Sequence, residues 1–164
     1  MKICITGASD SGKTAVALEL AKQLRKKNIS FSGVASPAYF TGGRKTEYFV
    51  RSLRTGTEKF LLKKSPAGPV PGGKGFVFAD RILARSFNRK VVIVDELGPI
   101  EADGAGFLKR VKALASKKGV VLIFTTRPGL VPVFSAMFGK VSVIDMDKSG
   151  SASALKRILC LLSA

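Results

Sequence analysis

The sequence predicts an α/β fold, in which a mostly parallel sheet lies between two layers of helices and carries a β-hairpin insertion. Three observations predict it. Apolar residues alternate along the chain between strand-like runs and the i, i+3, i+4 spacing of helices. A glycine-rich loop joins the first strand-like run to the first helix-like stretch. The segment from Arg44 to Lys64 interrupts this alternation with two β-rich runs.

The first βαβ unit occupies the amino-terminal part of the chain. Residues Lys2 to Thr6 form a short apolar run that predicts a strand. A helix is expected from about Gly12 to Lys27, and Phe31 to Ser36 predicts a second strand, ended by Pro37. The helix is predicted by four apolar residues that share one face: Ala17, Leu20, Ala21 and Leu24.

The insertion follows. Glu47 to Leu53 and Lys59 to Leu62 are β-rich and flank Arg54-Thr55-Gly56-Thr57, which predicts a hairpin. Ser65 to Gly75 contains three prolines and four glycines and is expected to be a loop. We therefore expect a single domain over residues 1–164, with an insertion at about residues 40–76.

The second half returns to strands and helices. Val91 to Val94 is apolar without alternation, which is typical of a strand buried on both faces. Strands are also predicted at Val120 to Thr125 and Val141 to Ile144. Two helical stripes accompany them, one of Phe107, Leu108, Val111, Leu114 and Ala115, the other of Leu155, Ile158, Leu159 and Leu162. Ser149, Ser151 or Ser153 is expected to cap the last helix.

Composition excludes several classes of protein. The 46% of hydrophobic residues exclude a disordered chain, and no apolar run approaches the roughly 20 residues that span a bilayer. The first residues lack the features of a signal peptide, so a cytoplasmic protein is expected. The chain has no histidine, and Cys4 and Cys160 have no partner at metal-binding spacing. Catalysis by histidine and histidine-bound zinc are therefore excluded, and both cysteines are expected to be reduced thiols.

The net charge of +17 arises from 28 Lys and Arg against 11 Asp and Glu. A basic surface attracts nucleotides and other polyanions. The charges are spread over several segments, and no nucleic-acid-binding module is recognisable. A generally basic surface and a surface that binds RNA or DNA both remain open, and the sequence does not indicate an oligomeric state.

The loop Gly7-Ala8-Ser9-Asp10-Ser11-Gly12-Lys13-Thr14 matches the phosphate-binding pattern G-x-x-x-x-G-K-[ST] between a strand and a helix. Glycines let the backbone N–H groups point into one concavity, and the following helix terminus adds positive potential. Lys13 is expected to reach the β- and γ-phosphates, and Thr14 to bind Mg²⁺. Asp10 is open to three interpretations: it weakens phosphate binding, contacts the metal shell, or has no role.

Two acids follow the buried strand at Val91 to Val94. Asp95 is expected to hold Mg²⁺, directly or through water, opposite Thr14. Glu96 is expected to orient and deprotonate the water that attacks the γ-phosphorus. Paired acids at this position favour hydrolysis over simple binding. Glu101 is expected to be either a partner of these acids or a surface residue.

A transition state that spreads negative charge also requires a cation near the γ-phosphate. Arg127 follows the strand at Val120 to Thr125 and should emerge at the same edge of the sheet. Arg44 is the next candidate, with Arg51 and Arg54 as rivals on the hairpin. Each of these arginines could equally be a surface charge.

These residues resemble the small nucleoside-triphosphatases of the thermophile phosphohydrolase type. Val94 to Glu101 is similar to that family's D-E-[IL]-G-x-[ML]-E segment, and further similarities cover most of the chain from about Lys2 to Phe138. They lie at Gly104 and Gly106-Phe107, at Gly33 to Pro37, at Gly43-Arg44 and at Leu53 to Gly56.

The resemblance implies a phosphate-binding-loop fold whose sheet carries an extra strand and whose site carries a catalytic glutamate. It also implies Mg²⁺-dependent release of phosphate from ATP, GTP and other triphosphates. Gly7 to Thr14 would bind the phosphates, Asp95 the metal, and Glu96 would be the base. The chain departs from the family at Ser9-Asp10-Ser11, where a proline and a glycine are usual, and at Ala15, where a second threonine is common.

Three functions are therefore carried forward. The first is a nucleoside-triphosphate hydrolase that is broad in base. The second is a kinase of a small metabolite, with the Arg44 to Lys64 hairpin as a lid over an acceptor. The third is a nucleic-acid-associated ATPase or a GTP-binding adaptor, because the loop is also similar to that of the molybdopterin-guanine-dinucleotide adaptor proteins.

Overall fold

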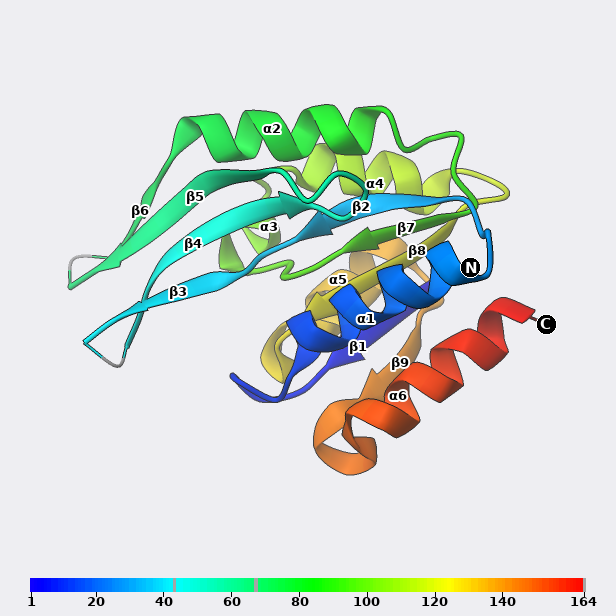
Figure 1. Ribbon diagram of the computed structural model, residues 1–164. Helices are drawn as coiled ribbons and strands as arrows, with labels where there is room; N and C mark the ends of the chain where they lie inside the picture. Colours follow the sequence, from blue (N-terminus) through cyan, green and yellow to red (C-terminus); the bar gives the residue numbers. More distant parts are fainter. Residues whose placement is uncertain (43, 67, 164) are drawn as a thin grey trace.

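A nine-stranded sheet with helices on both faces forms the molecule (Figure 1). The computed structural model describes residues 1–42, 44–66 and 68–163. The strands are β1 (Lys2–Thr6), β2 (Phe31–Ala35), β3 (Ala38–Thr41), β4 (Arg44–Ser52), β5 (Glu58–Ser65), β6 (Gly68–Pro71), β7 (Val91–Val94), β8 (Val121–Thr126) and β9 (Ser142–Asp145). The α-helices are α1 (Lys13–Lys26), α2 (Gly73–Ala84), α3 (Pro99–Ala102), α4 (Leu108–Ser116), α5 (Val131–Phe138) and α6 (Met146–Ser163).

The strands follow the order β6-β5-β4-β2-β7-β8-β1-β9, and β3 pairs with β4 outside this path. Strands β2, β7, β8, β1 and β9 pair in parallel, whereas β3 to β6 pair antiparallel. The expected α/β fold with a mostly parallel sheet and a β-hairpin insertion is therefore confirmed. Strand β8 lies between β7 and β1, which is the extra strand that the family resemblance implied.

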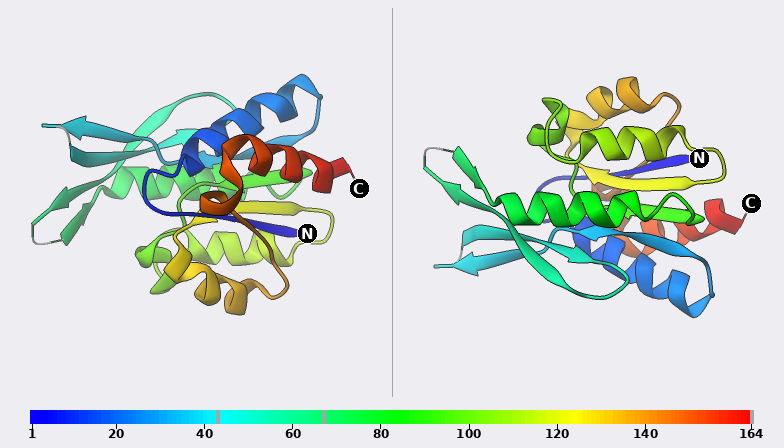
Figure 2. Two further views of the ribbon diagram at one scale, coloured as in Figure 1. Left: turned by 90° about the horizontal axis from the view of Figure 1, so that it is seen from below. Right: turned by 90° about the horizontal axis from the view of Figure 1, so that it is seen from above.

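Two hydrophobic clusters, one on each side of the sheet, form the core. Helices α2, α4 and α5 cover one face and α1 and α6 the other, as the views from above and below show (Figure 2). The apolar stripe predicted for the first helix is buried at Ala17, Leu20, Ala21 and Leu24. All four residues of β7 are buried, as a continuous apolar run predicts.

The segment from Ser65 to Gly75 differs from its expectation. It was expected to be a loop, but it forms strand β6 and the start of helix α2. Proline has no N–H group to donate. Among the described residues, however, β6 lies at the edge of the sheet and its neighbour in the strand order is β5. An edge strand therefore tolerates prolines that a central strand would not.

Three further helices were not expected from the sequence: α2, α3 and α5. The carboxy-terminal helix also begins earlier than expected. A turn from Met146 precedes a break at Gly150, whose φ is 70°, and the hydroxyl of Ser149 donates to the carbonyl oxygen of Asp145 at 2.7 Å. The glycine accounts for the break, because its left-handed conformation interrupts the helix. In the described part of the chain, none of the helices has the length and apolar character needed to cross a membrane.

Candidate active site

The carboxyl ends of four parallel strands, β1, β7, β8 and β9, carry the predicted site. The loop of residues 7–12 follows β1, the two acids follow β7, Arg127 follows β8, and α6 follows β9. Parallel neighbours end at the same edge of the sheet, so segments far apart in sequence meet there. In Figure 1 the strands β3 to β6 extend beyond this same edge.

The loop between β1 and α1 has the conformation that its glycines permit. The φ angles of Gly7 and Gly12 are 157° and 88°. A Cβ atom at Gly7 would lie 2.7 Å from the Oγ of Ser11 and 3.1 Å from Oδ1 of Asp147. A side chain at position 7 would therefore collide with these atoms, and the loop would have to change its conformation.

Lys13 lies across this loop. Its Nζ donates to the carbonyl oxygens of Gly7, at 2.8 Å, and Ala8, at 2.6 Å. Burial lowers the pKa of Lys13, and the carboxylates of Glu96, Asp95 and Asp147 oppose that shift. Lys13 therefore lies within the electrostatic reach of both predicted acids.

Asp95 is fully buried and its carboxylate is held on both oxygens. The backbone N–H of Ser36 donates to Oδ2 at 3.0 Å, and the hydroxyl of Thr125 donates to Oδ1 at 2.7 Å. The same Thr125 oxygen accepts the N–H of Glu96 at 2.7 Å. Thr125 thus fixes both acids from the neighbouring strand. Neither Ser36 nor Thr125 belongs to a recognisable nucleotide-binding motif, although each is a polar residue at the carboxyl end of a predicted strand.

Glu96 turns away from the end of β7. Its φ is 63°, an uncommon conformation for a residue that is not glycine, and its side chain is about one-third exposed. Partial burial and the neighbouring Asp95 raise the pKa of Glu96, and Arg127 opposes this shift. The arginine lies 3.8 Å from the glutamate carboxylate. A carboxylate with a raised pKa is suited to accept a proton.

The structure separates the candidate arginines. Arg127 lies beside Glu96, at the site, whereas Arg44 is exposed at the start of β4. Arg51 forms an ion pair with Glu58 inside the hairpin. Gly43, which precedes Arg44 and is part of the family resemblance, lies outside the described residues.

Asp10 has a partner on the hairpin. Its carboxylate forms an ion pair with Lys45, and its φ is 66°. The hairpin therefore contacts the phosphate-binding loop directly. Lys45 was not among the predicted residues, because nothing in a run of basic hairpin residues identifies which one faces the loop.

Asp147 was also missed. The N–H of Ala8 donates to its carboxylate, at 2.9 Å and 3.2 Å from the two oxygens. This contact joins the first turn of α6 to the start of the loop. Sequence offered no signal for it, since the two residues are 139 positions apart.

Glu101 is buried, with 4% of its surface exposed, which excludes the alternative of a surface residue. The N–H of Gly98 donates to its carboxylate at 3.1 Å, so Glu101 closes the turn that follows the two acids. Burial raises the pKa of Glu101 to about 7.

The oxygen ligands available at the site fit Mg²⁺. Within the described ranges, the acids and cysteines form no group of three that could hold a metal by itself. Mg²⁺, however, is usually bound by one or two protein oxygens together with water and substrate phosphates. The Thr14 hydroxyl and the Asp95 carboxylate are two hard oxygen donors of this kind. Thr14 follows Lys13 in the chain, and the charge of Asp95 acts on Lys13.

Comparisons with known proteins agree with this geometry. A family model described as NTPase matches residues 2–158. The nucleoside-triphosphatase THEP1 of Methanopyrus kandleri is 32% identical over 120 residues, which cover 69% of this chain and 66% of that relative. THEP1 of Methanothermobacter thermautotrophicus is 26% identical over 155 residues, or 90% and 89% of the two chains. The solution structure of a human cancer-related nucleoside triphosphatase, 20% identical, covers 99% of this chain and 98% of its own with a TM-score of 0.77. The last likeness shows the fold, and the family match shows that this chain belongs to the NTPase family of phosphate-binding-loop proteins, whose THEP1 members are its relatives.

Proposed function

We propose that this chain hydrolyses nucleoside triphosphates to the diphosphate and phosphate, with Mg²⁺ and with little preference for the base. The observation that carries the proposal is Glu96, which lies beside Arg127 and close to Lys13. A base, a cation and a phosphate-binding lysine therefore lie at the same carboxyl edge of the sheet. Membership of the NTPase family supports the same activity.

The triphosphate is bound by the loop of residues 7–14. Its backbone N–H groups donate hydrogen bonds to phosphate oxygens, and the amino terminus of α1 stabilises their negative charge. Lys13 exchanges its two carbonyl partners in the loop for phosphate oxygens, which carry more negative charge. These contacts are made to phosphates alone, which is why we propose broad base use.

Mg²⁺ would be held by Thr14 and Asp95, and when bound it neutralises negative charge on the β- and γ-phosphates. Asp95 is already oriented for this role by Ser36 and Thr125. Fixing a ligand in this way removes the need to reorder it during binding.

Glu96 takes a proton from the attacking water as the new bond to the γ-phosphorus forms. The bond from phosphorus to the bridging oxygen breaks, and the electron pair leaves with the diphosphate. Arg127 stabilises the negative charge on the transferring group.

We further propose that the whole chain acts as one domain and that its compartment is the cytoplasm, as expected from the sequence.

The test is phosphate release from ATP, GTP, CTP and UTP with Mg²⁺, in wild type, Glu96→Gln and Lys13→Ala. Glu96→Gln should lower the rate by about 10²- to 10⁴-fold, the usual contribution of a general base, with nucleotide binding retained. Lys13→Ala should lose binding as well. Glu19→Gln, the same exchange on the outer part of α1, is the matched control and should behave as wild type.

Wild type that binds nucleotide and releases no phosphate would contradict the proposal. Equal rates for Glu96→Gln and Glu19→Gln would contradict the assignment of the base. Addition of RNA or DNA to the same assay tests the nucleic-acid alternative, which stays a prediction.

A further inference from the structure

A second binding space adjoins the site. It is a cavity of about 340 Å³, and its lining includes Glu96 and Arg127. Its other walls come from strands β4 and β5, helix α2, and the turn and helix α3 that follow the two acids. The hairpin insertion therefore forms one side of a compartment whose other side is the catalytic edge.

The walls of this cavity are mainly apolar and aromatic. The rings of Tyr48, Phe76 and Phe107 line it, together with Leu61 and Ile100. Such walls bury the flat or apolar body of a small molecule, and a few polar groups then fix its orientation. Glu96 and Arg127 place the cavity at the γ-phosphate end of the triphosphate, where hydrolysis needs only water, so hydrolysis does not account for a cavity with this lining.

Glu96 belongs to both spaces. It lines the cavity, and its charge acts on Lys13 on the side of the phosphate-binding loop. A hydroxyl group held in the cavity therefore has the same proton acceptor as the attacking water.

We propose that the cavity binds an uncharged alcohol with a flat, apolar body of nucleoside size, and that the protein transfers the γ-phosphoryl group to its hydroxyl. This second activity rests on the proposed function, because it uses the same bound triphosphate. Water is the acceptor when the cavity holds no alcohol.

The charged side chains that line the cavity favour an acceptor without charge. Lys64 and Arg127 are the cations of the lining, and Glu96 and Glu101 are its acids. Arg127 is paired with Glu96, and Lys64 lies over the ring of Tyr48, 5.2 Å from its centre. An acceptor with a phosphate of its own would add negative charge beside two carboxyl groups and would compete with the γ-phosphoryl group for Arg127.

The transfer is balanced without another reactant. The acceptor oxygen forms a bond to the γ-phosphorus, and the bond from that phosphorus to the β-bridging oxygen breaks. Its electron pair leaves with the nucleoside diphosphate. Glu96 takes the hydroxyl proton and later releases it to water. The products are a phosphate monoester and the diphosphate.

The experiment uses ATP labelled at the γ-phosphate, Mg²⁺ and four uncharged probes: adenosine, guanosine, cytidine and thymidine. Chromatography separates labelled inorganic phosphate from labelled nucleoside monophosphate. With at least one probe, wild type should place label in the monophosphate at the expense of inorganic phosphate.

Two variants fill the cavity from different walls. Ile100→Trp acts from α3 and Ser65→Trp from the end of β5. Each should lower transfer to the probe at least about tenfold relative to phosphate release, because the added ring occupies the space of the acceptor. Val77→Trp, on the exposed side of α2, is the matched control and should leave both reactions unchanged.

The outcomes are distinct. Phosphate release without label in any nucleoside overturns the acceptor proposal and leaves hydrolysis standing. Label in a nucleoside that both cavity variants leave unchanged, while they still release phosphate, also overturns it. Absence of both reactions in wild type overturns the proposed function itself.

Discussion

Thr125 controls the positions of both acids at the site with one hydroxyl group. The hydroxyl donates to Asp95 and accepts the N–H of Glu96, each at 2.7 Å. Both bonds are lost together when the hydroxyl is removed, and Oδ1 of the buried Asp95 carboxylate then lacks its Thr125 donor. The orientation of the proposed metal ligand and the proposed base therefore depends on the hydroxyl group of a third residue.

Thr125→Val is expected to lower phosphate release by about 10- to 100-fold, the usual effect of losing a residue that orients a metal ligand. Thr125→Ser keeps the hydroxyl and should recover most of the rate. Thr126→Val is the matched control, because the Thr126 hydroxyl donates to the Leu97 carbonyl and not to either acid. It should lose stability while keeping its rate. Steady-state phosphate release and urea unfolding of all three variants separate the two effects.

The raised pKa of Glu101 should make the free energy of unfolding depend on pH. Burial raises its pKa to about 7 from a normal value near 4.5. The folded protein therefore binds a proton more tightly than the unfolded chain, and stability falls as pH rises from about 4.5 to about 7.

Glu101→Gln removes the ionisation and keeps an oxygen that accepts the Gly98 N–H. Between pH 4.5 and 8 the wild type should lose up to roughly 3 kcal/mol of unfolding free energy relative to this variant. Urea unfolding at a series of pH values measures the difference. Parallel pH profiles for the two proteins would show that Glu101 does not titrate with a raised pKa.

Helix α2 shows how close packing selects residues within one element. A Cβ atom at Gly75 would overlap the carbonyl oxygen of Phe60 in β5, whereas one at Gly73 would meet no atom within 4 Å. Helix and strand therefore approach each other at Gly75 more closely than any side chain allows.

Gly75→Ala should lower the unfolding free energy by about 1–3 kcal/mol, the usual effect of overpacking. Gly73→Ala should leave stability unchanged or raise it by up to about 1 kcal/mol, because alanine favours the helix. Thermal or urea unfolding of the pair measures this. Equal losses in both variants would mean that α2 does not pack on β5 as described.

The hairpin contacts the phosphate-binding loop through Lys45 and Asp10. Both side chains are partly exposed, so the ion pair itself contributes little to stability. Its effect should appear in binding. Lys45→Met leaves the Asp10 carboxylate uncompensated beside the bound phosphates and should raise the dissociation constant for ATP several-fold.

A double-mutant cycle tests this contact. Asp10→Asn should tighten ATP binding and should cancel most of the loss caused by Lys45→Met, because the repelling charge is then absent. Arg44→Met, the neighbouring hairpin cation, is the control. If Lys45→Met weakens binding equally with and without Asp10, the lysine acts on the nucleotide directly and the ion pair has no role.

Sequence predicted the elements that its own pattern defines. Strand β7 is recognisable from a continuous apolar run, and α1 from its apolar stripe. Helix α2 was missed because glycines at its start and prolines before it are typical of loops. Those residues are explained only by the tertiary structure, in which β6 is an edge strand and Gly75 touches β5.

The same limit applies to the site. Gly7 to Thr14, Asp95 and Glu96 follow local patterns that accompany phosphate chemistry, so sequence could propose them as site residues. Lys45 and Asp147 reach the loop from distant segments, and their partners depend on how the hairpin and α6 pack. Long-range contacts of this kind leave no local signal.

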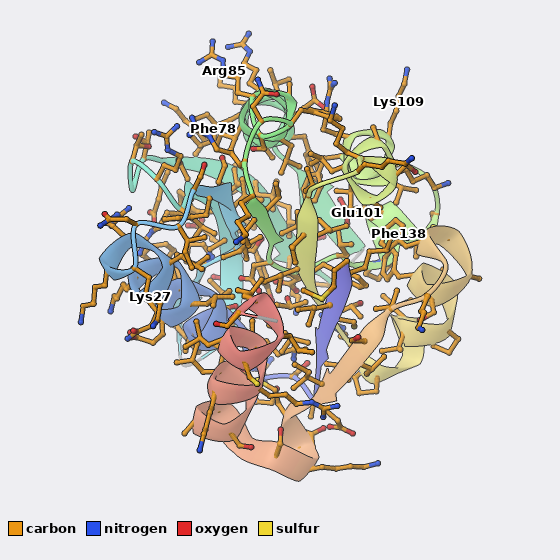
Figure 3. All side chains as sticks on the ribbon, turned by 90° about the vertical axis from the view of Figure 1, so that its right-hand side faces the viewer. Lys27, Phe78, Arg85, Glu101, Lys109 and Phe138 are labelled. Carbon is orange, nitrogen blue, oxygen red and sulfur yellow. The ribbon has the colours of Figure 1, made fainter. Side chains whose placement is uncertain are left out.

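For the whole molecule, the dominant physical feature is its net charge of +17. Basic side chains project from several elements, including Lys27 after α1, Arg85 after α2 and Lys109 on α4 (Figure 3). Their mutual repulsion destabilises the folded state, while the same field attracts a polyanionic nucleotide. Salt should therefore act in opposite directions on stability and on binding.

Raising NaCl from about 0.01 M to about 0.1 M shortens the Debye length from about 30 Å to about 10 Å. The melting temperature of the protein should rise, because repulsion between like charges is screened, and the KM for ATP should rise as well. A variant with Lys27→Gln, Arg85→Gln and Lys109→Gln removes three positive charges far from the phosphate-binding loop. It should melt higher than wild type at low salt and show a smaller salt response. Calorimetry and steady-state kinetics across the same salt series measure both effects, and a melting temperature that falls with salt would show that attractive ion pairs outweigh the repulsion.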